Sequence, residues 1–401
     1  METMWLLIVF TFATRSFASL RLGRPKVENI LTSKSAPSSE NGSWTDLGRS
    51  SPSLIENGSA REPLTPTELG GSELAEDHVS PETLHESSEV LNNGKMIILD
   101  RLGQGTFGSV YMCLDTVSDD YCVVAVKVNQ PTKEALQIAI REERILTDLK
   151  ERALISLSLG RHAVVEFLGG FLDTTDRYCL TFEPLGMSLL ALLEQNNFVG
   201  FHTHDIALIL RSCSEALEFI HEAGYIHADL KPENICIVTD SFYACAPPDR
   251  YREVAPDSYH RAVLEGHAAA TVKVVDFGSA LPVDGQKPDT VVTVGYRAPE
   301  IIQRQPYSKP IDMWALACIG GELYLGNQSL FKTGKFHTEE GVMQSIRARL
   351  GDPGAEVRQP SLREQFGSEP RLLQFLESLL KMDPAERSTA TDVLRSAWFC
   401  Q

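Results

Sequence analysis

Three side chains of complementary chemistry lie close together in the segment HADLKPEN, residues 227–234. Asp229 offers a carboxylate that can accept the proton of an attacking hydroxyl, and Lys231 offers an ammonium that can steady a phosphoryl group during its transfer. Asn234 offers an amide oxygen that can hold a magnesium ion from the far end of the same loop. The residue types and their spacing together indicate phosphoryl-transfer chemistry.

A second carboxylate belongs to the same pattern. Asp276 opens the triplet DFG, 47 residues after Asp229. Asn234 and Asp276 are predicted to hold two magnesium ions that bridge the β and γ phosphates of ATP and neutralise the charge that develops on the leaving group. A DFG triplet is common by chance, but its place after HADLKPEN makes this pair specific.

A glycine-rich turn is expected to contact the phosphates. It consists of Gly103, Gln104, Gly105, Thr106, Phe107 and Gly108. Glycines let the backbone close over phosphates, but the same pattern also occurs between a strand and a helix in dinucleotide-binding folds. Here a β-like run stands on each side of the turn, so the context favours a phosphate lid that joins strand to strand.

A lysine in an apolar strand needs an anionic partner. Lys127 lies in the run CVVAVKV, residues 122–128, where an unpaired ammonium would be costly to bury. A helix is predicted over residues 135–150, and Glu142 shares its face with the apolar residues that follow. Glu142 is therefore the predicted partner of Lys127, and Glu143, about 100° further round the helix, is the alternative.

The segment VVTVGYRAPE, residues 291–300, supplies supporting contacts. Thr293 is predicted to touch Asp229 and Lys231. A structural ion pair is predicted between the glutamate that ends this segment, Glu300, and Arg387 of DPAERST. Asp312 is expected to begin a buried central helix and to hold the backbone of the 227–234 loop.

Together these motifs resemble the eukaryotic protein kinase family over residues 94–399. The resemblance implies an α+β, bilobal protein kinase fold. A small antiparallel β-sheet lobe with one helix would end at about residue 184, and a large, mainly helical lobe would begin at about residue 185. It also implies transfer of the ATP γ-phosphate to serine or threonine hydroxyls of proteins, with Mg²⁺ as cofactor; Lys231 is typical of serine/threonine kinases. Dual specificity stays open, and a kinase-like scaffold without turnover is the alternative function.

The resemblance further implies how the adenine ring is bound. The run YCLTFEPLG, residues 178–186, looks like the hinge between the lobes, with Phe182 behind the ring. The backbone groups of Glu183 and Leu185 would bond the edge of the ring. Its faces would lie in an apolar slot formed by Leu102, Val110, Ala125 and Cys236.

Within the family the chain is most similar to the CMGC group, and in particular to the LAMMER-type, homeodomain-interacting and dual-specificity tyrosine-regulated kinases. Arg297 in YRAPE and the insert 239–271 carry this similarity, whereas GVMQSIRARLG, residues 341–351, keeps almost nothing of the LAMMER signature. Ala228 stands where the commonest kinase loop has an arginine that pairs with an activation-loop phosphate. We therefore expect activity without that phosphate.

Composition narrows the function classes. A chain of 401 residues with 43% apolar residues can bury large cores, while a net charge of −17 argues against a general electrostatic grip on nucleic acid. Eight cysteines without a CxxC pair signal neither a zinc site nor a disulfide framework, so free and mostly buried thiols are expected. The expected partners are protein substrates, with no direct nucleic acid, and the chain is expected to be a monomer.

Residues 1–93 differ in composition from the rest of the chain. Residues 1–18 form a signal-like apolar segment whose run Met4–Ala13 is shorter than the ~20 residues that a membrane-spanning helix needs, so no stable membrane span is expected. Glu2 stands where a signal peptide has a positive charge. The nucleus or cytoplasm is favoured, with the secretory route as the alternative. Residues 19–93, rich in Ser, Pro and Glu, are predicted to be a disordered tether, and residues 94–401 the kinase domain.

Overall fold

The computed structural model describes residues 89–105, 107–117, 122–238, 251–253, 262–264, 271–289, 291–326, 329–331 and 338–399. The apolar segment 1–18, the predicted tether up to residue 88, Thr106 of the glycine-rich turn and most of the insert 239–271 lie outside the described residues. In the part of the chain that is described, no helix is both long and apolar enough to cross a bilayer.

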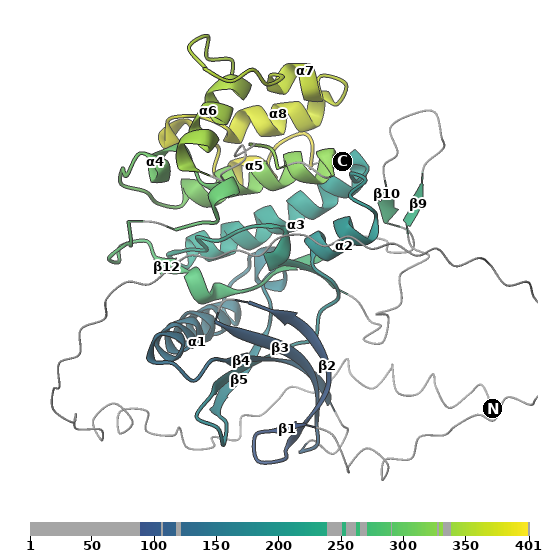
Figure 1. Ribbon diagram of the computed structural model, residues 1–401, viewed down its shortest axis with the longest axis vertical. Helices are drawn as coiled ribbons and strands as arrows, with labels where there is room; N and C mark the ends of the chain where they lie inside the picture. The colour runs from purple at the N-terminus through teal and green to yellow at the C-terminus, as the bar shows by residue number, and fades with distance from the viewer. Residues whose placement is uncertain are drawn as a thin grey trace, which may run out of the picture. The chain divides into compact units, whose positions relative to one another are not determined.

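The smaller lobe is built on one antiparallel sheet with the strand order β1-β2-β3-β4-β6-β5. Its strands are β1 (Val90–Leu91), β2 (Met96–Gln104), β3 (Gly108–Asp115), β4 (Cys122–Asn129), β5 (Phe167–Leu172) and β6 (Tyr178–Phe182). Figure 1 shows α1 (Lys133–Ala153) lying against this sheet. The predicted sheet lobe with one helix is confirmed.

The sheet begins a few residues before the predicted start of the kinase domain at residue 94. Val90 and Leu91 fall within the predicted tether, yet they pair antiparallel with Ile97 and Met96 of β2. Leu91 is 2% exposed, and the backbone N–H of Asn92 donates to Asp173. The Ser- and Glu-rich composition hid this short strand, because one buried leucine and a tight turn suffice to add it to the sheet.

Strand alternation in β4 determines where Lys127 points. Val124, Val126 and Val128 pack on one face of the sheet, in a small cluster with buried cysteines. Ala125 and Lys127 therefore lie on the opposite face, and Ala125 belongs to the main core cluster, which also holds residues of α1. The β-branched pattern of this strand thus aims the lysine at the helix.

Helix α1 begins where the side chain of Thr132 accepts a hydrogen bond from the backbone N–H of Ala135. An acidic residue in its first turn and basic residues in its last turn suit the helix dipole. Its buried face includes Glu142 together with Ile145, Leu146 and Leu149, as the sequence predicts. Ala135 and Ala139, which precede Glu142, are buried as well.

The larger lobe is mainly helical, as expected. Its α-helices are α2 (Leu189–Gln195), α3 (Thr203–Glu222), α4 (Pro299–Ile302), α5 (Pro310–Leu325), α6 (Glu339–Arg349), α7 (Leu362–Phe366), α8 (Pro370–Leu379) and α9 (Ala390–Leu394). Short 3₁₀ helices occur at η3 (Leu159–His162), η4 (Pro232–Asn234), η5 (Phe277–Ser279), η6 (Val294–Tyr296) and η8 (Pro384–Glu386). Three two-stranded ladders pair β7 (Tyr225–Ile226) with β12 (Leu281–Pro282), β8 (Ile235–Ile237) with β11 (Val272–Val274), and β9 (Tyr251–Glu253) with β10 (Ala262–Leu264).

Helix α5 is the centre of this lobe. It is buried on nearly all sides and packs against α3 and α8 (Figure 1). A proline in its first turn suits the start of a helix, because the missing N–H would have no partner there. Its Trp314 stacks on Phe331 with ring centroids 5.4 Å apart.

The predicted pair of Glu300 and Arg387 is confirmed as a buried ion pair. The two side chains are 1% and 0% exposed and share two hydrogen bonds of 2.6 and 2.7 Å. The guanidinium also lies 5.0 Å from the ring centre of Trp314. The pair fastens the start of α4 to the segment that follows α8.

We expect Arg387→Ala to lower the free energy of unfolding by about 3–5 kcal/mol, because it leaves the Glu300 carboxylate buried without a partner. Urea denaturation of the purified protein measures this change. The matched control is Arg363→Ala: this arginine is 80% exposed and pairs with Glu377, so its loss should cost less than about 1 kcal/mol. Equal losses in the two variants would contradict the structural role of the buried pair.

Candidate active site

The loop 227–234 is held from below by one buried carboxylate. Asp312, in the first turn of α5, accepts hydrogen bonds of 2.9 Å from the backbone N–H groups of His227 and Ala228. His221 of α3 lies 2.9 Å from the same carboxylate. Burial alone would raise the pKa of Asp312, but these contacts outweigh it and lower that pKa. The predicted support of the loop by Asp312 is confirmed.

Asp229 is oriented by two neighbours. One carboxylate oxygen accepts a hydrogen bond of 2.7 Å from Lys231. The other accepts from the backbone N–H of Thr293 at 3.1 Å and from its hydroxyl at 2.8 Å. Lys231 also donates to the same hydroxyl at 3.2 Å. The predicted contact of Thr293 with both residues is confirmed, and it ties the segment before α4 to the loop.

Asn234 and Asp276 present oxygen atoms of the kind that magnesium prefers. The amide nitrogen of Asn234 donates a hydrogen bond of 2.9 Å to the backbone oxygen of Asp229. The amide oxygen of Asn234 takes no part in this contact and could bind a metal ion. The side chain of Asp276 is 44% exposed. The described residues contain no group of three or more His, Cys, Asp or Glu that could hold a metal by themselves. Mg²⁺ typically takes one or two carboxylates and completes its shell with waters and phosphates, so Asn234 and Asp276 are residues that could hold it.

The backbone of Asp276 is strained. Its φ of 62° lies in the left-handed region, which costs a non-glycine residue about 1–2 kcal/mol. The next residue, Phe277, is fully buried and meets the His227 ring edge-on at 5.1 Å. His227 also lies 3.1 Å from the backbone oxygen of Val275. These contacts on both sides hold the strained turn in place.

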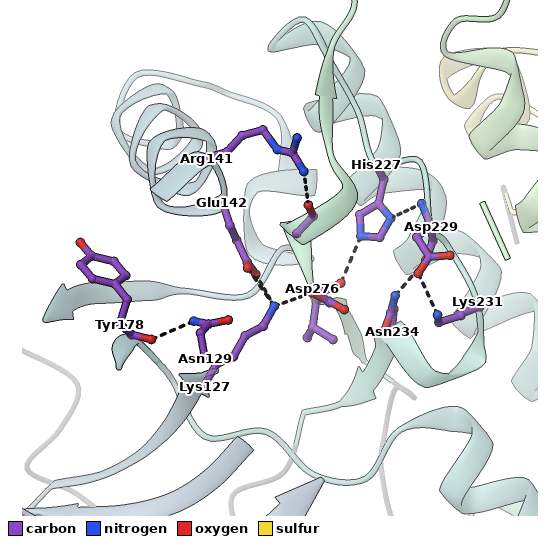
Figure 2. Close-up of polar contacts among 12 residues, drawn as sticks. Lys127, Asn129, Arg141, Glu142, Tyr178, His227, Asp229, Lys231, Asn234 and Asp276 are labelled. Atoms are coloured by element: carbon purple, nitrogen blue, oxygen red, sulfur yellow. Dashed lines mark hydrogen bonds and ion pairs between the residues drawn. The ribbon is translucent and has the colours of Figure 1, made fainter. Parts of the chain in front are cut away.

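Lys127 joins the two lobes of the site, as Figure 2 shows. Its ammonium lies 3.0 and 2.8 Å from the two carboxylate oxygens of Glu142, which is 0% exposed, and 2.7 Å from an oxygen of Asp276. Burial alone would lower the pKa of Lys127, but the two carboxylates outweigh it and raise that pKa. Burial also opposes ionisation of Asp276, yet Lys127 lowers its pKa below the usual value.

The predicted choice of Glu142 over Glu143 is confirmed. Glu143 lies on a neighbouring face of α1, where it accepts a hydrogen bond of 2.6 Å from the Tyr178 hydroxyl of β6. It is partly buried, so it is more than a solvated charge. Its contact joins the helix to the sheet at a second point.

The glycine-rich turn joins β2 to β3, so the strand-to-strand prediction is confirmed and a dinucleotide-type strand–helix turn is wrong. Gly108 must be glycine, because a Cβ there would lie 2.2 Å from the backbone oxygen of Val128. Gly103 faces open space, and Gly105 donates its N–H to the Gly108 oxygen at 2.8 Å. Phe107 is 39% exposed at the tip. The Gln104 side chain accepts a hydrogen bond from Arg101.

The residues of the predicted adenine slot come from the sheet, from the hinge after β6 and from β8. Ala125 and Phe182 are buried partners in the β4–β6 register. Val110 and Leu185 pack partly buried against the main core, and Leu102 is 43% exposed at the rim.

Two further observations bear on this slot. Burial raises the pKa of the Cys236 thiol to about 12, so it stays neutral and behaves as a small apolar side chain. The N–H of Glu183 donates to Glu166 at 3.1 Å, which leaves the Glu183 carbonyl for a ring edge. The five described cysteines without disulfides, Cys113, Cys179, Cys213, Cys236 and Cys318, agree with the expected free thiols.

Sequence reasoning missed one contact that fixes the hinge. The Glu183 carboxylate accepts a hydrogen bond of 2.5 Å from Lys273 of β11 and one of 2.6 Å from the Glu166 backbone. Glu183 and Lys273 are 90 residues apart, and no local pattern pairs them. The hinge side chain is therefore tied to the floor of the site through a contact that only the fold reveals.

Comparisons with known proteins agree with this geometry. Residues 96–399 match the family model described as the protein kinase domain. This chain belongs to the protein kinase family. The kinase is 29% identical to the serine/threonine-protein kinase AFC2 of Arabidopsis thaliana, over 76% of each chain. It is 29% identical to the human dual specificity protein kinase CLK2 and 30% identical to the human dual specificity tyrosine-phosphorylation-regulated kinase 4.

The extent of these matches differs. Each human match covers 76% of this kinase but 64% and 57% of the relative, so the chain spans less than two thirds of those proteins. A solved structure described as a kinase domain aligns with a TM-score of 0.62 at 25% identity, over 79% of this chain and 99% of that chain. The predicted resemblance to LAMMER-type and dual-specificity tyrosine-regulated kinases of the CMGC group is confirmed.

The kinase is a serine/threonine protein kinase domain whose family uses ATP and Mg²⁺ and acts on proteins. When bound, Mg²⁺ neutralises phosphate charge during transfer. The geometry fits the roles predicted for three residues. Lys127, kept charged by the carboxylates around it, is placed where it could hold phosphate oxygens. Asp229, oriented by Thr293, is placed where it could accept the proton of the acceptor hydroxyl, and Lys231 lies beside it, where it could balance the charge on the group in transfer.

We expect Asp229→Asn to lower the turnover rate by ~10²-fold or more, because an amide keeps the contact with Thr293 but cannot accept a proton. Incorporation of labelled phosphate from ATP into a basic test protein measures the rate. Asp352→Asn, which changes an exposed carboxylate near the end of α6, is the control. An unchanged rate in Asp229→Asn would contradict its role as the base.

Proposed function

We propose that this kinase phosphorylates serine and threonine without prior phosphorylation of its activation segment, residues 276–300. The observation that carries the proposal is the double hydrogen bond from Thr293 to Asp229, which places the segment against the catalytic loop. Outside the catalytic loop, Lys287 donates to the Tyr307 backbone at 2.9 Å, and the Tyr307 hydroxyl donates to the backbone of Pro288 at 2.8 Å. These contacts are made by unmodified side chains and backbone groups.

Ala228 supports the same proposal. Its methyl group is fully buried and its N–H is bonded to Asp312, so the catalytic loop keeps its shape without an arginine at this position. Its φ of 62° is the left-handed conformation that the loop requires. Without a guanidinium there, this position has no cation with which to bind an activating phosphate.

We expect Thr290→Ala to keep turnover within about threefold of the unmodified protein, because the contacts that hold the described part of the segment use no phosphate. Thr290 lies outside the described residues, and it is a better test than Thr293, whose hydroxyl serves Asp229 directly. Steady-state rates are measured on protein shown to be phosphate-free by intact mass. A fall of more than about tenfold, in the variant or on phosphatase treatment, would contradict the proposal.

We further propose that the kinase prefers proline directly after the acceptor residue. Val292 has a φ of 67°, and its backbone oxygen accepts a hydrogen bond of 2.8 Å from Arg297. The guanidinium is braced by Glu339 of α6 at 2.5 Å. This carbonyl is therefore already used and does not serve the N–H of a following residue, which suits proline because it has none.

Paired peptides test this preference. We expect a Ser-Pro peptide to exceed its Ser-Ala partner in kcat/KM by about tenfold, since an unmatched N–H costs about 1–3 kcal/mol when it loses water without gaining a partner. Arg297→Ala should reduce the ratio by freeing the Val292 carbonyl. Equal rates for the two peptides would rule the proline preference out. The alternative is a preference for a basic residue upstream of the acceptor, read by Glu233.

We also make proposals on acceptor specificity, partners and location. Dual specificity is a second candidate, because two of the relatives carry it in their names. The net charge of −17 supports the proposal that the chain binds no nucleic acid directly. We also propose a monomer located in the nucleus or cytoplasm; a mature amino terminus at Ser19 would instead place it in the secretory route. A scaffold without turnover is disfavoured by the assembled Lys127, Asp229, Asn234 and Asp276.

A further inference from the structure

Helix α1 contacts the site through two consecutive residues that point to different partners. Glu142 binds Lys127, whereas Arg141 donates a hydrogen bond of 2.8 Å from its guanidinium to the backbone oxygen of Gly278 (Figure 2). One turn of the helix therefore holds both the phosphate-binding lysine and the turn that carries Asp276.

The position of Gly278 makes this contact consequential. Gly278 lies in η5, directly after the strained Asp276 and the buried Phe277. A hydrogen bond of 3.0 Å from the N–H of Ala280 to the backbone oxygen of Phe277 closes this turn. A Cβ on Gly278 would lie 3.4 Å from the Glu142 carboxylate, so the turn is close to the helix. A shift of α1 away from the turn would break the Arg141 contact and separate Glu142 from Lys127 at the same time.

The alanine at position 228 of the catalytic loop makes the contact of Arg141 with the activation segment more important. With Ala228 before Asp229, that position lacks a cation that could reach the activation segment. Among the described contacts, cations from outside the segment reach it at four places. Lys127 binds Asp276, Arg141 binds Gly278, Lys231 binds Thr293, and Arg387 binds Glu300 at the far end of the segment. Arg141 is the one of these four placed to join α1 directly to the backbone of the turn.

We propose that Arg141 is a positioning residue that clamps α1 to the turn after Asp276, and so keeps the site assembled in the phosphate-free kinase. It is exposed and acts through Gly278. The proposal rests on the proposed phosphate-independent activity, and it gives that activity a physical cause: a built-in arginine–backbone contact takes the place of a contact that depends on modification.

The test compares Arg141→Gln with Arg144→Gln in the full chain. Arg144 lies about one turn further along α1, and its side chain is exposed and makes no hydrogen bond or ion pair to the described residues. We expect Arg141→Gln to lower kcat by about three- to tenfold while the KM for ATP changes by less than about twofold. Hydrogen exchange of the backbone amides in residues 276–280 should quicken by about tenfold or more, and Arg144→Gln should change neither quantity.

Arg141→Lys supplies a conservative variant. Lysine keeps the positive charge and can still donate a hydrogen bond, but its side chain is shorter than that of arginine. Arg141→Lys should therefore recover part of the kcat and part of the protection from hydrogen exchange. Equal kcat and equal exchange rates in Arg141→Gln and Arg144→Gln would overturn the inference. A fall of more than about 3 °C in the melting temperature of Arg141→Gln would also overturn it, because it would indicate a general structural role for this arginine. If the unsubstituted phosphate-free kinase is itself inactive, the proposed function fails; the exchange comparison still decides the clamp.

Discussion

The site depends on a partly buried ammonium. Lys127 is 18% exposed, and its position on a strand within the core would be costly without anions beside it. Two carboxylates from different parts of the chain meet it, one on α1 and one after β11. Removing either carboxylate would break the contact that ties its own segment to the lysine, so the lysine holds the helix, the sheet and the DFG turn in one arrangement.

Other contacts keep these anions where the lysine needs them. Asp312 fixes the catalytic loop through its backbone, and His227 of that loop packs against Phe277 beside Asp276. Thr293 then brings the activation segment to Asp229. The chain of contacts runs from the central helix of the large lobe to the proton-accepting carboxylate, and each step uses a backbone group or a buried side chain. These contacts are the physical basis of the proposed activity without a phosphate on the activation segment.

Much of this arrangement can be predicted from the sequence. The loop 227–234, the DFG triplet and the strand lysine are local patterns, and the helical register of α1 distinguishes Glu142 from Glu143. Ion pairs such as that of Glu300 with Arg387 follow because their motifs are specific to a family. These residues can be recognised in the sequence because their chemistry needs a fixed residue type at a fixed spacing.

Other contacts could not be predicted. Arg141 meets a backbone oxygen 137 residues away, and Lys273 meets a hinge glutamate 90 residues away; such pairs have no local signature. A backbone acceptor carries no residue type to recognise, and an exposed arginine on a helix is ordinary. The short strand β1 was hidden by polar composition, since its stability comes from pairing with β2 and from the burial of Leu91.

The most direct test of the central claim is the kcat/KM for ATP in Glu142→Gln compared with Glu143→Gln. The two residues are neighbours on one helix, yet one binds Lys127 and the other binds Tyr178. The account predicts a fall of about 10²-fold, or about 2.7 kcal/mol, in Glu142→Gln and less than about threefold in Glu143→Gln, whose amide oxygen can still accept from tyrosine. Similar values for the two variants would contradict the claim that the Lys127–Glu142 pair holds the site together.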